Sequence, residues 1–128
     1  MTFEQIFGLD STSLTIPIRP EWSYNYSRDE LDESEQKYFK SWIDGIYKKV
    51  PNRNLLSFFE HNLEVWRQLW RVCEISNILV VVADIRNPIV HLPPSFCYYV
   101  THKLKKPMII ALTKVLPGFY IISFYQYL

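Results

Sequence analysis

The chain has 128 residues, which limits it to one domain, small for an α/β domain that hydrolyses a nucleotide. Hydrophobic residues make up 48% and aromatic residues 16%, so the composition predicts a packed core rather than a disordered chain. The formal net charge of +1 gives no overall field that would attract nucleic acid or an anionic membrane. We therefore expect no direct DNA binding and no membrane association.

Cysteine use and the apolar segments predict an intracellular protein. Cys73 and Cys97 are not at a metal-ligand spacing, so we interpret them as reduced thiols of the core. The first residues, "MTFEQIFGLDSTS", lack the basic and apolar regions of a signal peptide. The apolar run "NILVVVA" is too short to span a bilayer.

Glycine is scarce, and this scarcity excludes the usual phosphate-binding loops from the sequence. The three glycines are Gly8, Gly45 and Gly118. A loop of the form G-x-x-x-x-G-K-[ST] needs closely spaced glycines, because backbone N–H groups must approach the phosphates. The 128 residues contain neither this P-loop pattern nor G-x-G-x-x-G.

An irregular lead and one helix are expected over residues 1–54, which we interpret as an N-terminal extension. Ser27 and Glu30 form a capping-box pattern at the predicted start of the helix. Acidic residues are concentrated in the first turns of this helix, and Lys48 and Lys49 lie in its last turn, a distribution that the helix dipole favours. Pro51 is expected to end the helix. The apolar residues at helical spacing are Leu31, Tyr38, Phe39, Trp42, Ile43, Ile46 and Tyr47.

A second helix is expected over Leu55–Ile75. Its apolar stripe follows a 4-3-4-3 spacing and predicts core packing. The stripe consists of Phe59, Leu63, Trp66, Trp70 and Cys73. Arg67 and Arg71 lie on a neighbouring face, where we expect solvation or pairing with Glu64 and Glu74 rather than ligand binding.

Two apolar runs that flank a short helix predict a parallel pair of strands in an α/β sheet. "NILVVVADIRNP" and "PMIIALTKV" are the strands, and Pro93 and Pro94 begin the helix between them. Ligands of such sheets bind beyond the carboxyl ends of the strands. Those ends carry a first group of polar residues, Asp84, Arg86 and Asn87, and a second group, Thr113 and Lys114.

Together these segments resemble the circularly permuted GTPases of the nucleostemin-like group. The resemblance rests on "FFEHNLEVWRQLWRVCEISNILVVVADIRNPIVHLPP", on "IIALTKV" and on the preceding "IPIRPEWSYNYSRDELDESEQKYFKSWI", and it covers Ile16 to Val115. It implies a helical extension followed, over residues 55–116, by the first part of a three-layer, P-loop GTPase-like G domain. In that family a guanine-reading [N/T]-K-x-D turn precedes the P-loop in the sequence.

The resemblance also assigns individual residues. Thr113 and Lys114 match the first two positions of the guanine motif, and Asp84, Arg86 and Pro88 match the signature D-x-R-x-P, interpreted as positioning structure. It implies GTP and Mg²⁺ as cofactors, a guanine nucleotide and a pre-ribosomal particle as partners of the full-length protein, and a nuclear, nucleolar or cytoplasmic location. No catalytic residue and no metal site is expected in this chain.

The sequence departs from the family at the guanine motif. Leu116 occupies the position of the Asp that accepts two hydrogen bonds from guanine. The aromatic tail 117–128 does not resemble the family, so we expect a truncation within the motif. The alternative is that the tail pairs as a third strand, with Pro117–Gly118 as the turn of a hairpin. The chain alone is expected not to hydrolyse GTP and to bind it negligibly. The other interpretation is a non-catalytic module that binds protein or ribonucleoprotein partners.

Overall fold

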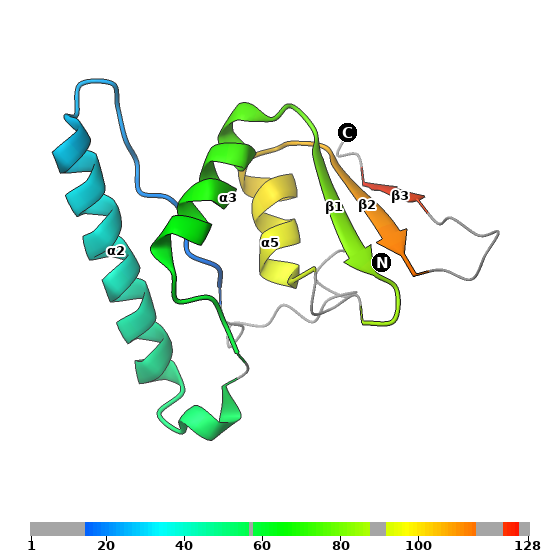
Figure 1. Ribbon diagram of the computed structural model, residues 1–128, viewed down its shortest axis with the longest axis horizontal. Coiled ribbons are helices and arrows are strands. Elements are labelled where there is room, and N and C mark those ends of the chain that lie inside the picture. The colour runs from blue at the N-terminus through cyan, green and yellow to red at the C-terminus, as the bar shows by residue number, and fades with distance from the viewer. Residues whose placement is uncertain (1–14, 57, 88–91, 115–121, 126–128) are drawn as a thin grey trace. The chain divides into compact units, whose positions relative to one another are not determined.

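The computed structural model describes residues 15–56, 58–87, 92–114 and 122–125 (Figure 1). The chain divides into two compact units. We call Pro17–Glu74 the helical unit, and the described residues from Ile75 onward the sheet unit. None of the described helices is long and apolar enough to cross a bilayer. The expected domain limits, 1–54, 55–116 and 117–128, stay predictions.

The first helix of the helical unit, α2, spans Arg28–Lys49 and confirms the sequence prediction. The Ser27 hydroxyl accepts a hydrogen bond from the backbone N–H of Glu30, and the Glu30 carboxylate accepts one from the backbone N–H of Ser27. This capping box satisfies backbone donors that have no partner within the helix. Val50, directly before Pro51, ends the helix.

The second helix, α3, spans Leu63–Ile75, so the prediction that it begins at Leu55 was wrong. A 3₁₀ turn, η1, over Arg53–Leu55 precedes it. Two asparagines explain the difference, because their side-chain oxygens satisfy backbone donors locally: Asn52 accepts from the N–H of Asn54, and Asn62 from that of Glu64. Such bonds favour turns and helix starts over a helix interior.

The core of the helical unit forms where α2 and α3 pack against each other. Trp70 is 2% and Cys73 0% exposed, which confirms that the predicted stripe packs into a core. The Trp70 indole N–H donates to the Pro17 carbonyl at 3.0 Å. The Trp42 ring lies edge-on to Trp66, with 5.8 Å between the ring centroids. Each indole therefore contributes apolar area, and that of Trp70 keeps its polar atom hydrogen-bonded.

A buried carboxylate links the lead segment to both helices. Glu35 on α2 is 7% exposed, and its two oxygens accept from different arginines. Arg19 Nε donates to Oε1 and Arg67 Nε donates to Oε2, each at 2.8 Å. A charge of this kind is stable inside a protein only when it is paired and hydrogen-bonded. Glu35 therefore depends on both guanidinium groups.

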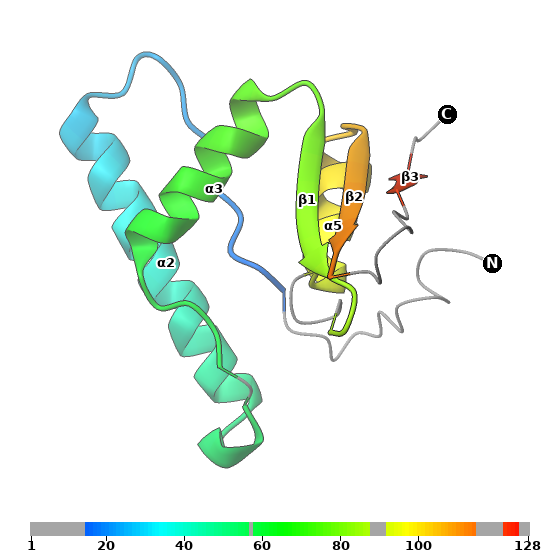
Figure 2. The same ribbon diagram turned by 45° about the vertical axis from the view of Figure 1, so that its right-hand side comes forward.

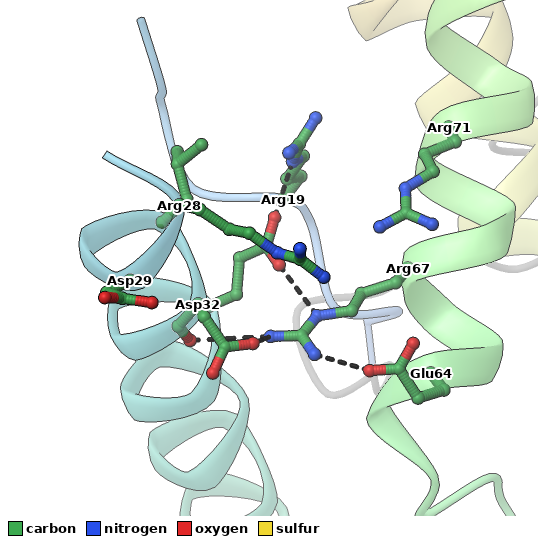
Figure 3. Close-up of a pocket in the computed structure, with 9 residues that line it drawn as sticks. Arg19, Arg28, Asp29, Asp32, Glu64, Arg67 and Arg71 are labelled. Atoms are coloured by element: carbon green, nitrogen blue, oxygen red, sulfur yellow. Dashed lines mark hydrogen bonds and ion pairs between the residues drawn. The ribbon is translucent and has the colours of Figure 1, made fainter. Parts of the chain in front are cut away.

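Arg67 on α3 uses its remaining nitrogens for two further carboxylates (Figure 3). Its Nη2 lies 2.5 Å from the Asp32 carboxylate, and its Nη1 lies 2.5 Å from that of Glu64, which confirms the expected Arg67–Glu64 pair. Burial disfavours the charged guanidinium, but the hydrogen bonds to Glu64, Glu35 and Asp32 outweigh it and raise the pKa of Arg67 above its ordinary value.

For Arg71 the structure shows solvation, the first of the two expected alternatives, rather than a pair with Glu74. Glu74 accepts from Arg19 Nη1 at 2.7 Å and from the Trp22 indole N–H at 3.1 Å. Among the described residues, no hydrogen bond or ion pair joins Arg71 to a carboxylate. The prediction considered only neighbours on the same helix, whereas the lead segment brings Arg19 to Glu74 from 55 residues away.

The sheet unit contains a three-stranded sheet in the order β1-β2-β3. β1 spans Leu79–Asp84 and pairs in parallel with β2, Met108–Thr113, which confirms the predicted parallel pair and the mixed α/β character. β3, Ile122–Tyr125, pairs with β2 antiparallel, which is the direction expected for the alternative in which the tail forms a third strand in a hairpin. A parallel return needs a longer crossover than the residues between β2 and β3 provide. The Pro117–Gly118 turn lies outside the described residues.

The connection between β1 and β2 contains the predicted short helix, which lies against one face of the sheet (Figures 1 and 2). α5 spans Pro94–Tyr98 and continues as a π-helical turn, η2, over Tyr99–Lys103 that the sequence did not predict. Cys97 and Val100 are both 0% exposed. Burial raises the pKa of the Cys97 thiol to about 11, so the thiol is protonated and unreactive near neutral pH.

Replacement of Glu35 by Gln is expected to destabilise the helical unit by about 2 kcal/mol, because two half-buried guanidinium groups then lose a charged acceptor. The loss is limited because Arg19 keeps Glu74, and Arg67 keeps Asp32 and Glu64. Urea unfolding monitored by tryptophan fluorescence measures the change. Glu33→Gln, at an exposed position of the same helix, removes the same charge and should change stability by less than about 0.5 kcal/mol. Equal losses in the two variants would contradict the role of Glu35.

Candidate functional site

The polar residues predicted at the ends of the two strands meet at one edge of the sheet. In the parallel register Asp84 is paired with Thr113, the last residue of β1 with the last of β2. The backbone N–H of Ile85 donates to the Thr113 carbonyl at 3.1 Å, so the pairing continues one residue beyond β1. We call Asp84, Arg86, Thr113 and Lys114 the carboxyl-edge site. Parallel pairing places all four at the end of the sheet where α/β proteins bind ligands.

Asp84 and Arg86 form a bidentate ion pair within a tight turn. Arg86 Nη2 lies 2.6 Å from Asp84 Oδ2, and Arg86 Nε lies 3.0 Å from Oδ1. The backbone N–H of Arg86 also donates to Oδ1 at 3.0 Å, and the N–H of Asn87 donates to the Asp84 carbonyl at 3.1 Å. Asp84 thereby holds both the backbone and the side chain of Arg86, the behaviour of an Asx turn reinforced by charge.

These contacts stabilise the ionised form of Asp84. The side-chain hydrogen bonds from Arg86 lower its pKa most, followed by the Arg86 backbone N–H, and the nearby charge of Lys114 acts in the same direction. The pKa of Asp84 falls to about 2, so the carboxylate is ionised throughout the physiological range. Asp84 is therefore a fixed hydrogen-bond acceptor rather than a general acid.

Thr113 and Lys114 form the end of β2. The Thr113 hydroxyl donates to the Ala83 carbonyl at 3.3 Å, a side-chain bond across the strand pair that the sequence did not predict. Lys114 has a φ of 61°, a left-handed conformation that is uncommon for a residue with a side chain. The chain therefore leaves the strand direction directly after Thr113, and the Lys114 side chain is exposed.

The structure brings together four of the six residues that the sequence assigned. Pro88, the last position of the D-x-R-x-P signature, and Leu116, at the guanine-reading position, lie outside the described residues. Within the described ranges, no group of three His, Cys, Asp or Glu side chains could hold a metal ion. The four described residues can fix a turn and present a cation, but they include no nucleophile with an adjacent base.

The ion pair predicts the pH dependence of the carboxyl-edge site. A carboxylate whose pKa is lowered in the folded chain stabilises it above the ordinary pKa of 3.8, and this contribution is lost as the pH falls from about 4 to about 2. Carbon-detected NMR titration of the Asp84 carboxyl group should show the lowered pKa. Arg86→Gln should raise it toward 3.8, whereas Arg53→Gln, outside this site, should leave it unchanged. An Asp84 titration unaltered by Arg86→Gln would contradict the pairing.

The cross-strand bond of Thr113 predicts a modest effect on stability. Thr113→Val keeps the shape of the side chain and removes the hydroxyl, so about 1 kcal/mol of unfolding free energy should be lost. Thr113→Ser retains the donor and should recover most of it. Denaturant unfolding of the two variants tests this, and equal stabilities would show that the bond contributes nothing.

Comparison with known proteins supplies the context of this site. No protein-family model matches the chain. The chain is 43% identical over 102 residues to guanine nucleotide-binding protein-like 1 of Homo sapiens and of Mus musculus, which covers 80% of the chain and 17% of each relative. It is 40% identical over 93 residues to GTPase LSG1-2 of Arabidopsis thaliana, which covers 72% of the chain and 16% of that protein.

The matched region is large for this chain and small for its relatives, since the chain spans less than a fifth of their length. Both relatives bear names of guanine nucleotide-binding proteins or GTPases. The resemblance to the nucleostemin-like group of circularly permuted GTPases is therefore confirmed over most of the chain as a partial match.

Proposed function

We propose that this chain is a part of a GTP-binding protein of the circularly permuted type, in which the carboxyl edge of β1 and β2 forms the guanine-recognition side of a P-loop GTPase-like sheet. The observation behind the proposal is the register that pairs Asp84 with Thr113. This register gathers the D-x-R signature and the first two guanine-motif positions, which are 29 residues apart in the sequence, at one edge. The similarity to guanine nucleotide-binding protein-like 1 supports the same assignment.

Each residue of the carboxyl-edge site has a role in this proposal. Asp84 and Arg86 hold the turn after β1 rigid, so they position the edge rather than touch the nucleotide. Thr113 fixes the end of β2 through the Ala83 carbonyl, and the left-handed Lys114 turns the chain so that its aliphatic stem can lie along a base. A preorganised turn of this kind lowers the entropy that is lost when a ligand binds.

By itself the chain is proposed to bind GTP negligibly and not to hydrolyse it. Leu116 offers no acceptor for the guanine N–H groups, and loss of such a charged acceptor costs on the order of 2–5 kcal/mol. The 128 residues also contain no G-x-x-x-x-G-K-[ST] pattern, so they do not supply the backbone donors that hold phosphates and Mg²⁺ in GTPases.

A second function, a non-catalytic module for protein or ribonucleoprotein partners, is favoured by a separate observation. The helical unit forms its own core and ion-pair network, yet it leaves two large aromatic side chains almost fully exposed. Tyr24 is 94% and Phe58 95% exposed. Exposed aromatic residues on a rigid scaffold are typical of binding surfaces.

A chimera tests the first proposal under conditions where GTP can bind. The matched 102-residue segment of human guanine nucleotide-binding protein-like 1 is replaced by the corresponding segment of this chain, followed by either Leu or Asp at position 116. Titration with a fluorescent GTP analogue should show at least about 30-fold tighter binding for the Asp form, because the bidentate acceptor is restored.

Two controls make the result interpretable. Circular dichroism of both chimeras checks that they fold alike, and a fluorescent ATP analogue checks that the gain is specific for guanine. Equal GTP affinities of the Leu and Asp forms, with both chimeras folded, would show that this edge does not read the base. If neither form bound GTP while the parent did, the proposed placement of the segment in a G domain would fail.

A further inference from the structure

A polar pocket of about 450 Å³ lies in the helical unit between the start of α2 and α3, and it includes no residue of the carboxyl-edge site (Figure 3). Nine residues line it, and four of them are arginines: Arg19, Arg28, Arg67 and Arg71. Four carboxylates line the same pocket: Asp29, Asp32, Glu35 and Glu64. Which of the four arginines are paired with these carboxylates therefore decides which of them can bind a ligand.

Two of these arginines are already bound by carboxylates. Arg67 donates from Nε, Nη1 and Nη2 to Glu35, Glu64 and Asp32, and Arg19 donates from Nε to Glu35. The three carboxylates are thus engaged as acceptors with the two guanidinium groups of Arg19 and Arg67. Asp29 also lines the pocket, and Figure 3 draws no interaction between it and the other residues shown.

Arg28 and Arg71 differ from Arg19 and Arg67 in that they are not paired with a carboxylate in the part of the chain that the structure describes. Among the described residues no hydrogen bond or ion pair joins either of them to a carboxylate, and both are exposed. Figure 3 shows both side chains extending from their helices toward the space between α2 and α3. Like charges that face one pocket repel, and an anion between them would remove that repulsion. Each guanidinium keeps a planar set of N–H donors free for such an anion.

We propose that Arg28 and Arg71 bind a phosphate monoester group in this pocket. The two free positive charges match the two negative charges of a phosphate monoester, whereas a carboxylate would neutralise only one. The planar fork of guanidinium donors fits phosphate oxygens in a bidentate manner. A volume of about 450 Å³ is far larger than a phosphate ion, so the pocket has room for the group that bears the phosphate.

Charge balance offers a competing role for the same two arginines. The ion-pair network has four carboxylates, Asp32, Glu35, Glu64 and Glu74, and two guanidinium groups, Arg19 and Arg67. Arg28 and Arg71 would offset this difference of two charges without binding anything. In that case their removal lowers stability, but phosphate has no specific effect. The two roles are therefore separated by an anion titration.

The test is NMR of the arginine side-chain Nε–Hε signals while inorganic phosphate is added at pH 7.5, with chloride at matched ionic strength as the reference. Saturable shifts are expected for Arg28 and Arg71 and not for Arg53, which lies over the Tyr47 ring outside the pocket. Arg28→Gln and Arg71→Gln should each weaken phosphate binding about tenfold or more, while Arg53→Gln removes the same charge and should leave it unchanged.

Two further measurements keep the outcome unambiguous. Arg71→Lys keeps the charge without the fork and should weaken binding several-fold, and circular dichroism verifies that every variant is folded. Binding that is absent, or equally strong in Arg28→Gln, Arg71→Gln and Arg53→Gln, would overturn the proposal in favour of charge balance.

The source of the phosphate follows from a second titration with a phosphoserine peptide. Tighter binding than inorganic phosphate indicates a phosphorylated side chain, and equal binding indicates a free phosphate.

Discussion

The parallel pairing of β1 with β2 is the constraint on which the candidate site depends. In a parallel pair both strands end at the same edge, so residues that are far apart in the sequence become neighbours there. Here the pairing brings the turn after Asp84 to the turn after Thr113. A slip of one residue would place Thr113 on the opposite face of the sheet and break its hydrogen bond to the Ala83 carbonyl. The apolar strand residues that fix this register are therefore as important to the site as its polar side chains.

The helical unit is organised by charge as well as by apolar packing. Glu35 is buried beside the core residue Phe39 on α2, a position where an unpaired carboxylate would be strongly unfavourable. The lead segment supplies Arg19 and α3 supplies Arg67, so the carboxylate requires both segments to be in place. Apolar stripes alone would allow α2 and α3 to slide along each other, whereas these directional bonds fix one arrangement.

Sequence reasoning succeeded where a local pattern decides the structure. The capping box at Ser27 and the apolar runs of β1 and β2 predicted elements that the structure confirms, because each depends on residues close together in the chain. It failed where a segment distant in the sequence supplies the partner in place of a local residue. The partner of Glu74 is Arg19, and the start of α3 depends on Asn62 rather than on the apolar residues before it. The antiparallel direction of β3, by contrast, agrees with the hairpin alternative, because a short connection after β2 permits an antiparallel return and not a parallel one.

Asp84 raises the question of whether another carboxylate could replace the acceptor that is absent at position 116. It lies at the same edge as Thr113 and Lys114, and it is ionised at neutral pH. Both of its oxygens, however, already accept from Arg86, and the Asp84 side chain also holds the Arg86 backbone. Guanine would have to displace a bidentate, charge-assisted pair in order to gain hydrogen bonds from neutral N–H groups, which are weaker. The exchange is therefore unfavourable, and the rigidity that makes Asp84 a good support for the turn prevents it from reading the base.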